Sequence, residues 1–116
     1  VVAYATRIKA QVLGVDAAHL ERTGPVDRDV ALQMADGVRR LLGADVGLAT
    51  TGVAGPGPAD GHPAGTVHVA VVAPWGEAHC ELHLSGERAQ IRRRTVLNVI
   101  ELAVALLKEN ARRERI

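Results

Sequence analysis

The chain has 116 residues, 47% of them hydrophobic, which is enough for one globular domain with a single core. Its 14 basic and 13 acidic residues leave a net charge of +1, so charge gives no indication of a nucleic-acid partner, and no apolar run is long enough to span a membrane. The single cysteine excludes an internal disulfide bond and favours a reducing, cytoplasmic location.

The first part of the chain is predicted to contain a strand and a helix. Residues 1–5 (VVAYA) are short, apolar and β-branched, which is typical of a buried strand. Residues 6–14 are predicted to form a short helical turn or a loop that ends at Gly14. Asp16 is a good N-cap for a helix over 17–23.

A longer helix is predicted over residues 28–42. Its apolar residues recur at helical spacing, Asp27 is suited to cap its start, and Gly43 is suited to end it. An apolar strand over 44–50 follows. The absence of phenylalanine, with one tryptophan and one tyrosine, means that the core around these elements is expected to be aliphatic.

Two strands, 66–73 and 77–84, are predicted to form a hairpin through the tight turn Pro74-Trp75-Gly76. Pairing Ala73 with Ala78 sets the expected register. The face expected to be buried then comprises Val67, Val69, Val71, Cys80, Leu82 and Leu84.

The last predicted helix covers residues 86–110 and is capped by Ser85. Helices alternate with strands before the hairpin, so the predicted fold class is α/β: a three-layer α/β/α sandwich with a mixed sheet that also contains residues 1–5. The apolar stripe expected on the last helix comprises Ile91, Thr95, Val99, Ala103 and Leu106, widened by Val96, Ile100 and Leu107.

A glycine-rich segment, TTGVAGPG (50–57), follows the strand expected at 44–50. Its backbone N–H groups can converge on an anion or a carbonyl oxygen, and Thr50 and Thr51 add hydroxyl groups where α/β sheets usually bind ligands. The pattern is equally typical of an irregular surface loop. No Walker lysine follows it, which argues against a nucleoside triphosphate site.

Two further segments are candidates for chemistry. Lys9 lies shortly after Tyr4, the only tyrosine, and a lysine whose pKa is lowered by burial can act as a general base, although a solvated loop lysine is commoner. Arg88 lies in SGER (85–88), which opens a helix and can hold an anion, although simple capping explains the same residues. The arginines at 92–94 are typical of a solvated helix face.

Neither a metal nor another cofactor is expected. Among the five histidines, only the pairs His79/His83 and His68/His83 have a spacing suited to a shared ion. Ser85, the only serine, is at a predicted helix cap, so these residues alone assemble no serine nucleophile.

Several motifs resemble the CinA C-terminal domain family. TTGVAGPGPADGHPAGTVHVAV (50–71) is similar to the family signature TGIAGP…KPVGTV. VVAYATRIKAQVLGV is similar to its YSNEAK and LLGV segments, ERTGPVDRDV to its HGAVS segment, and SGERAQIRRRTV to SGDRxxIRxxA. The resemblance covers essentially the whole chain, which is therefore expected to be one CinA C-terminal-like domain over 1–116, truncated at its N-terminus.

The resemblance implies an activity and roles for particular residues. The family hydrolyses the amide of nicotinamide mononucleotide to nicotinate mononucleotide and ammonia, with a serine and a lysine and without a metal. Lys9 matches the catalytic base, and Tyr4 matches the tyrosine beside it, so the resemblance implies that Lys9 and Tyr4 are the catalytic residues. The substrate-binding residues implied by the resemblance are Thr51, Gly52, Gly55 and Arg88.

The family's nucleophilic serine lies in an upstream motif, ESCTGG, that this chain does not contain. The chain also starts inside a predicted strand without a methionine, so we expect preceding residues to be missing and the serine to come from them. Thr6 stands where relatives have asparagine, and His62 stands where they commonly have lysine.

Two functions remain open at this point. The first is an amidohydrolase acting on a small nucleotide substrate. The second is a non-catalytic nucleotide-binding or protein-interaction module linked to competence and the response to DNA damage. A homo-oligomer is expected because missing residues would leave apolar surface uncovered, and no direct nucleic-acid or membrane partner is expected.

Overall fold

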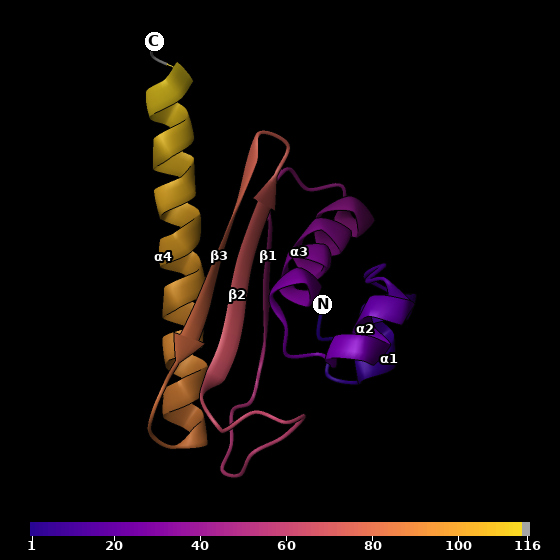
Figure 1. Ribbon diagram of the computed structural model, residues 1–116. Helices are drawn as coiled ribbons and strands as arrows, with labels where there is room; N and C mark the ends of the chain where they lie inside the picture. The colour runs from indigo at the N-terminus through magenta and orange to yellow at the C-terminus, as the bar shows by residue number, and fades with distance from the viewer. Residues whose placement is uncertain (115–116) are drawn as a thin grey trace.

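A three-stranded antiparallel sheet forms the middle layer of the structure, a computed structural model that describes residues 1–114 (Figure 1). The strands, which pair in the order β1-β2-β3, are β1 (Gly47–Gly52), β2 (Thr66–Ala73) and β3 (Gly76–His83). The helices are α1 (Thr6–Gln11), α2 (Ala17–Thr23), α3 (Arg28–Leu42) and α4 (Arg88–Glu114). Because α3 covers one face of the sheet and α4 the other, the predicted three-layer α/β/α class is confirmed.

Helix α3 has the bounds that its sequence predicts. The Asp27 carboxylate accepts hydrogen bonds from the main-chain N–H groups of Asp29 (3.0 Å) and Val30 (3.2 Å), and such a cap contributes about 1 kcal/mol. Gly43 ends the helix in the left-handed conformation, with φ +63°. The first and last turns of α3 are therefore determined by local side chains.

The core is divided between the two faces of β2, whose Val69 and Val71 are fully buried. On one face, α3 and the residues around α1 and α2 pack against Ala49 and Ala70. On the other face, the valines of β2 pack against the buried side of α4. As the composition predicts, the buried hydrophobic residues are aliphatic or small.

Helix α3 lies unusually close to the edge strand β1. A Cβ atom added at Gly47 would lie 2.0 Å from the main-chain oxygen of Ala35 and 2.9 Å from the Cβ of Arg39. Only glycine leaves room for this approach, so Gly47 sets the distance between α3 and the sheet.

Residues 1–5 do not form the strand that their pattern predicts. They pair with none of β1–β3, and Val2 is 90% exposed. The main-chain oxygen of Ala3 instead accepts a hydrogen bond from the Lys9 side chain. Without this strand, the described sheet is wholly antiparallel rather than mixed. An apolar, β-branched run becomes a strand only where a partner strand accepts its hydrogen bonds.

The hairpin of β2 and β3 is confirmed, but its register differs from the prediction by two residues. Ala73 pairs with Gly76 rather than with Ala78, so the turn contains only Pro74 and Trp75. A shift of two residues leaves each side chain on its predicted face. Cys80 is nevertheless exposed rather than buried, because β3 is an edge strand of the sheet.

Two predicted helix caps are not formed. Helix α4 begins at Arg88, three residues beyond Ser85, and the Gln90 side chain accepts a hydrogen bond from the Glu87 N–H (2.8 Å). Asp16 does precede α2, but its side chain makes no capping hydrogen bond. In both cases the residue type was suitable, and the geometry of the preceding loop decided the outcome.

Helix α4 buries only part of its predicted stripe. Ile91, Thr95, Val99 and Ala103 are buried, whereas Val96, Ile100 and Leu107 are 53%, 49% and 45% exposed. No helix within residues 1–114, including this long one, has the length and hydropathy needed to cross a membrane. The exposed apolar strip of α4 comprises Val96, Leu97, Ile100, Val104 and Leu107.

Replacing Gly47 with alanine tests the contact between α3 and β1. We expect Gly47→Ala to lower the free energy of unfolding by about 1–3 kcal/mol, the usual cost of overpacking, measured by urea denaturation. Gly57→Ala is the matched control, because a Cβ there would meet nothing within 4 Å. Equal stability of the two variants would contradict the proposed spacing.

Candidate active site

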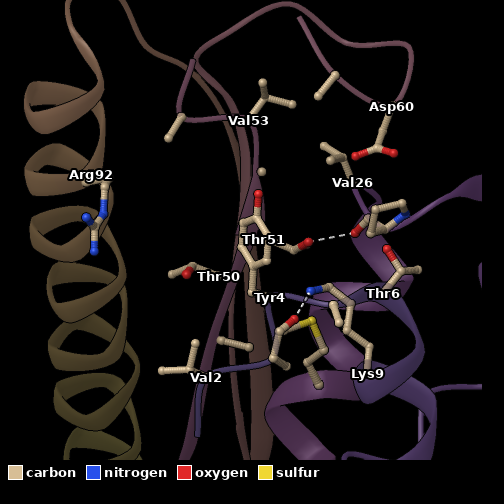
Figure 2. Close-up of a pocket in the computed structure, with 18 of the residues that line it drawn as sticks. Val2, Tyr4, Thr6, Lys9, Val26, Thr50, Thr51, Val53, Asp60 and Arg92 are labelled. Carbon is tan, nitrogen blue, oxygen red and sulfur yellow. Dashed lines mark hydrogen bonds between the residues drawn. The ribbon is translucent and has the colours of Figure 1, made fainter. Parts of the chain in front are cut away.

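An open cleft of about 960 Å³ lies where α1, β1, the loop after β1 and the start of α4 converge (Figure 2). It follows the edge of β1, so residues from both faces of that strand reach it. The cleft-lining residues include every site residue named from the sequence: Tyr4, Lys9, Thr51, Gly52, Gly55 and Arg88. Segments far apart in the sequence are thereby brought to one place.

Lys9 lies on α1 with only 6% of its surface exposed. Its Nζ donates a hydrogen bond of 2.5 Å to the main-chain oxygen of Ala3. Burial lowers the pKa of Lys9 below its ordinary value of 10.5, and the negative charge of Asp60 partly opposes this shift. A lysine in this environment loses its proton more readily than a solvated one, which is the property that a general base needs.

Thr51 is buried on the face of β1 that points toward α3. Its Oγ1 donates a hydrogen bond of 2.7 Å to the main-chain oxygen of Pro25, in the connection between α2 and α3 (Figure 2). Thr50 lies on the opposite face and is exposed. The hydroxyl of Thr51 therefore ties β1 to the helical layer, in addition to lining the cleft.

The glycine-rich loop folds back against the sheet and forms one wall of the cleft. The Val53 N–H donates to the Thr66 oxygen (2.9 Å), and the Gly65 N–H donates to the Val53 oxygen (2.7 Å). Gly65 has φ +94°, and a Cβ there would lie 1.8 Å from the Leu84 oxygen. The segment is thus an ordered loop whose first half lines the cleft.

Arg88 holds this loop in place. Its Nη1 donates a hydrogen bond of 2.8 Å to the main-chain oxygen of Gly55, which joins the first residue of α4 to the glycine loop. One nitrogen of the Arg88 guanidinium is therefore already engaged in a hydrogen bond within the protein. Tyr4, in contrast, is 88% exposed at the margin of the cleft.

Arg92 also lines the cleft, one helical turn beyond Arg88, although the sequence pattern assigned it to a solvated helix face. It lies on α4 across from Thr50 (Figure 2). Residues four apart share one side of a helix, so the Arg88–Arg92 spacing was the signal that could have identified it. Among the described residues, Arg92 makes no ion pair.

A cluster of His19, Asp27 and Asp29, none of which lines the cleft, brings three possible ligand atoms within 4.8 Å of one another. Burial alone would raise the pKa of Asp27, but the hydrogen bond from His19, the main-chain N–H groups of Val30 and Asp29 and the charge of His19 lower it overall. The cap of α3, with the 2.7 Å contact between His19 and Asp27, explains this arrangement.

A model of the CinA C-terminal domain family matches residues 1–107. The chain belongs to this family. The crystal structure of the competence/damage inducible protein CihA from Agrobacterium tumefaciens matches this chain with a TM-score of 0.84 and 37% sequence identity. The match covers 90% of this chain and 65% of that one. A CinA superfamily protein from Escherichia coli is 32% identical, with a TM-score of 0.83, and the match covers 89% of this chain and 60% of that one.

Longer relatives contain this domain as one part. A CinA-like protein from Frankia casuarinae is 44% identical over 107 residues, which cover 92% of this chain and 25% of that protein. The chain spans about a quarter of the length of the curated relatives it matches.

The environment of Lys9 can be tested by titration. We expect NMR of the lysine Cε–Hε groups to show a pKa for Lys9 below 10.5, with Lys108 of α4 as the second lysine signal. Because the charge of Asp60 raises the pKa of Lys9, Asp60→Asn should lower it further, whereas Asp45→Asn, at an exposed position outside the cleft, should not. A Lys9 pKa at or above 10.5 would contradict its burial.

Proposed function

We propose that this CinA domain contributes the base and the substrate cleft of an amidohydrolase that converts nicotinamide mononucleotide to nicotinate mononucleotide and ammonia. The observation that carries the proposal is the buried Lys9, which lies in one cleft with Thr51 and the glycine loop. An amide is a poor electrophile, so its hydrolysis needs both an activated nucleophile and donors for the developing oxyanion. The lysine and the loop supply groups of these two kinds.

In this mechanism the nucleophile is a serine from residues upstream of Val1. Its Oγ attacks the amide carbon while neutral Lys9 Nζ takes the hydroxyl proton. The C–N bond then breaks, and the same proton passes to the leaving nitrogen, which departs as ammonia. Water hydrolyses the resulting ester and restores the serine. In this proposal, main-chain N–H groups of the loop after Thr51 stabilise the oxyanion in both stages.

The cationic wall of the cleft fits the phosphate of a mononucleotide. Arg88 is partly occupied by its hydrogen bond to Gly55, so Arg92 is the better-placed cation for phosphate, and Arg88 keeps the loop in position. Tyr4 was expected to be catalytic, but its exposure at the margin of the cleft favours a role in covering bound substrate, which is the role that we propose for it. No metal or cofactor takes part in this mechanism.

Measuring ammonia release from nicotinamide mononucleotide tests this function. The protein that includes the residues encoded before Val1 should be active, and Lys9→Ala should lower turnover at least about a hundredfold, the scale of losing a general base. Lys9→Met, which keeps the length of the buried side chain, should behave alike, and Lys108→Ala is the control. Full activity of the Lys9 variants would overturn the mechanism.

The second candidate function, a protein-interaction module that forms a homo-oligomer, is favoured by the exposed apolar strip of α4. Its residues recur along one side of the helix, and such surfaces commonly mark interfaces. We expect Ile100→Glu to shift the sedimentation of the chain toward a smaller species, whereas Glu101→Lys, at a neighbouring exposed position, should not. Unchanged sedimentation of Ile100→Glu would exclude the strip as an oligomer interface.

A further inference from the structure

Two histidines, His68 on β2 and His79 on β3, are in contact with each other on the face of the sheet toward α3. His68 Nδ1 and His79 Nε2 are 2.9 Å apart, and the rings are nearly parallel, with centroids 5.1 Å apart and planes at 25°. The His68 side chain is 9% exposed. A hydrogen bond between two imidazole nitrogens requires one of them to carry a proton and the other to be unprotonated, so the protonation states of the two rings are coupled.

Strand pairing places His68 beside Thr51. The register of β1 and β2 sets Thr51 directly opposite His68, and the register of β2 and β3 sets His68 opposite Glu81, all on the face toward α3. Directly opposed side chains in antiparallel strands have Cβ atoms about 4.5–5.5 Å apart. Movement of the His68 ring therefore changes the packing of the threonine whose hydroxyl holds the α2–α3 connection at Pro25.

We propose that His68 and His79 form a proton-sensitive positioning pair for Thr51. With one proton between the facing nitrogens, the hydrogen bond holds the His68 ring against Thr51. A second proton makes both facing nitrogens donors, which breaks the hydrogen bond between the rings and loosens the cleft at Thr51. The consequence for turnover rests on the proposed amidohydrolase function, whereas the structural coupling does not.

The surroundings determine the direction of the effect. Burial lowers the pKa of both imidazoles below the ordinary value of 6.5. Carboxylates nearby favour protonation, and the other imidazoles and a guanidinium oppose it. The charged and titratable groups that face the pair are Glu81 and His83 on β3, Asp27, Arg28 and Asp29 at the start of α3, and His62 in the glycine loop.

The sign of the pH dependence follows from these lowered pKa values. The folded protein binds fewer protons at the pair than the unfolded chain does. The pair's contribution to stability is therefore fully present above pH 6.5 and is lost as the pH falls below 6.5 toward the folded pKa values. The proposed loosening at Thr51 requires protonation of the folded pair, so it takes place around the lowered folded pKa values, at the acid end of this window.

An NMR titration between pH 8 and pH 5 tests the coupling without any assay of activity. In the native chain, the methyl signal of Thr51 should shift with the same midpoint as the ring signals of His68 and His79. His79→Gln keeps a group that can hydrogen-bond to either protonation state of His68 but cannot itself titrate, so it should reduce the amplitude of that shift. His83→Gln is the control, because His83 is on the same strand but its side chain is 70% exposed. A Thr51 signal that does not titrate in the native chain, or that titrates with undiminished amplitude in His79→Gln, would overturn the proposal.

The pH profile of turnover extends the test to function. In the active protein, kcat/KM should fall as the pH is lowered, and in His79→Gln this fall should occur at a lower pH. In His83→Gln it should occur at the same pH as in the native protein. Absence of any deamidation would count against the proposed function alone, because the Thr51 titration still decides the coupling. If His79→Gln has normal activity and its kcat/KM falls at the same acid pH as in the native protein, the histidine pair does not influence substrate turnover.

Discussion

The close approach of α3 to the sheet is the constraint on which the rest of the structure depends. Gly47 and Ala35 meet with no room for another side-chain atom, and Ala31 and Ala70 are also fully buried in this layer. Small residues let the helix and sheet backbones approach, which a core rich in large aromatic residues would prevent. This short distance allows Pro25, just before α3, to accept a hydrogen bond from Thr51 on the sheet.

Helix α3 also locates Lys9. A Cβ atom added at Gly37 of α3 would lie 1.7 Å from the Leu13 oxygen, so the segment after α1 rests directly on the α3 backbone. Helix α1 has only six residues and would be marginal by itself, so its position depends on this contact. Lys9 is thereby held at the edge of β1, where its amine is desolvated but keeps Ala3 as a hydrogen-bond acceptor. Lys9 and Thr51 are therefore positioned by the same helix.

The sequence predicted best what depends on nearby residues. Helix α3 was predictable because Asp27 and Gly43 define its ends and its apolar spacing defines its buried side. The strand at 1–5 was wrong because a strand needs a partner strand, and the burial of Cys80 was wrong because it depends on the position of β3 at the edge of the sheet. The hairpin register was wrong because the turn is two residues shorter than the pattern predicted. For the site, the motif resemblance named six residues that line one cleft, whereas Arg92 was assigned to a solvated helix face although its spacing from Arg88 puts both on one side of α4.

The polar residues that the fold buries indicate where function is located. A buried polar group costs free energy unless it has a hydrogen-bond partner, and a stable core rarely needs one. Thr95 is explained locally, because its hydroxyl donates to Ile91 within α4. Lys9, Thr51 and His68 are different, since each is bonded to a residue of another segment, and all three lie around the α3-facing side of β1 and β2. Aliphatic residues would fill that space at lower cost, so the packing of the fold alone does not account for these three side chains.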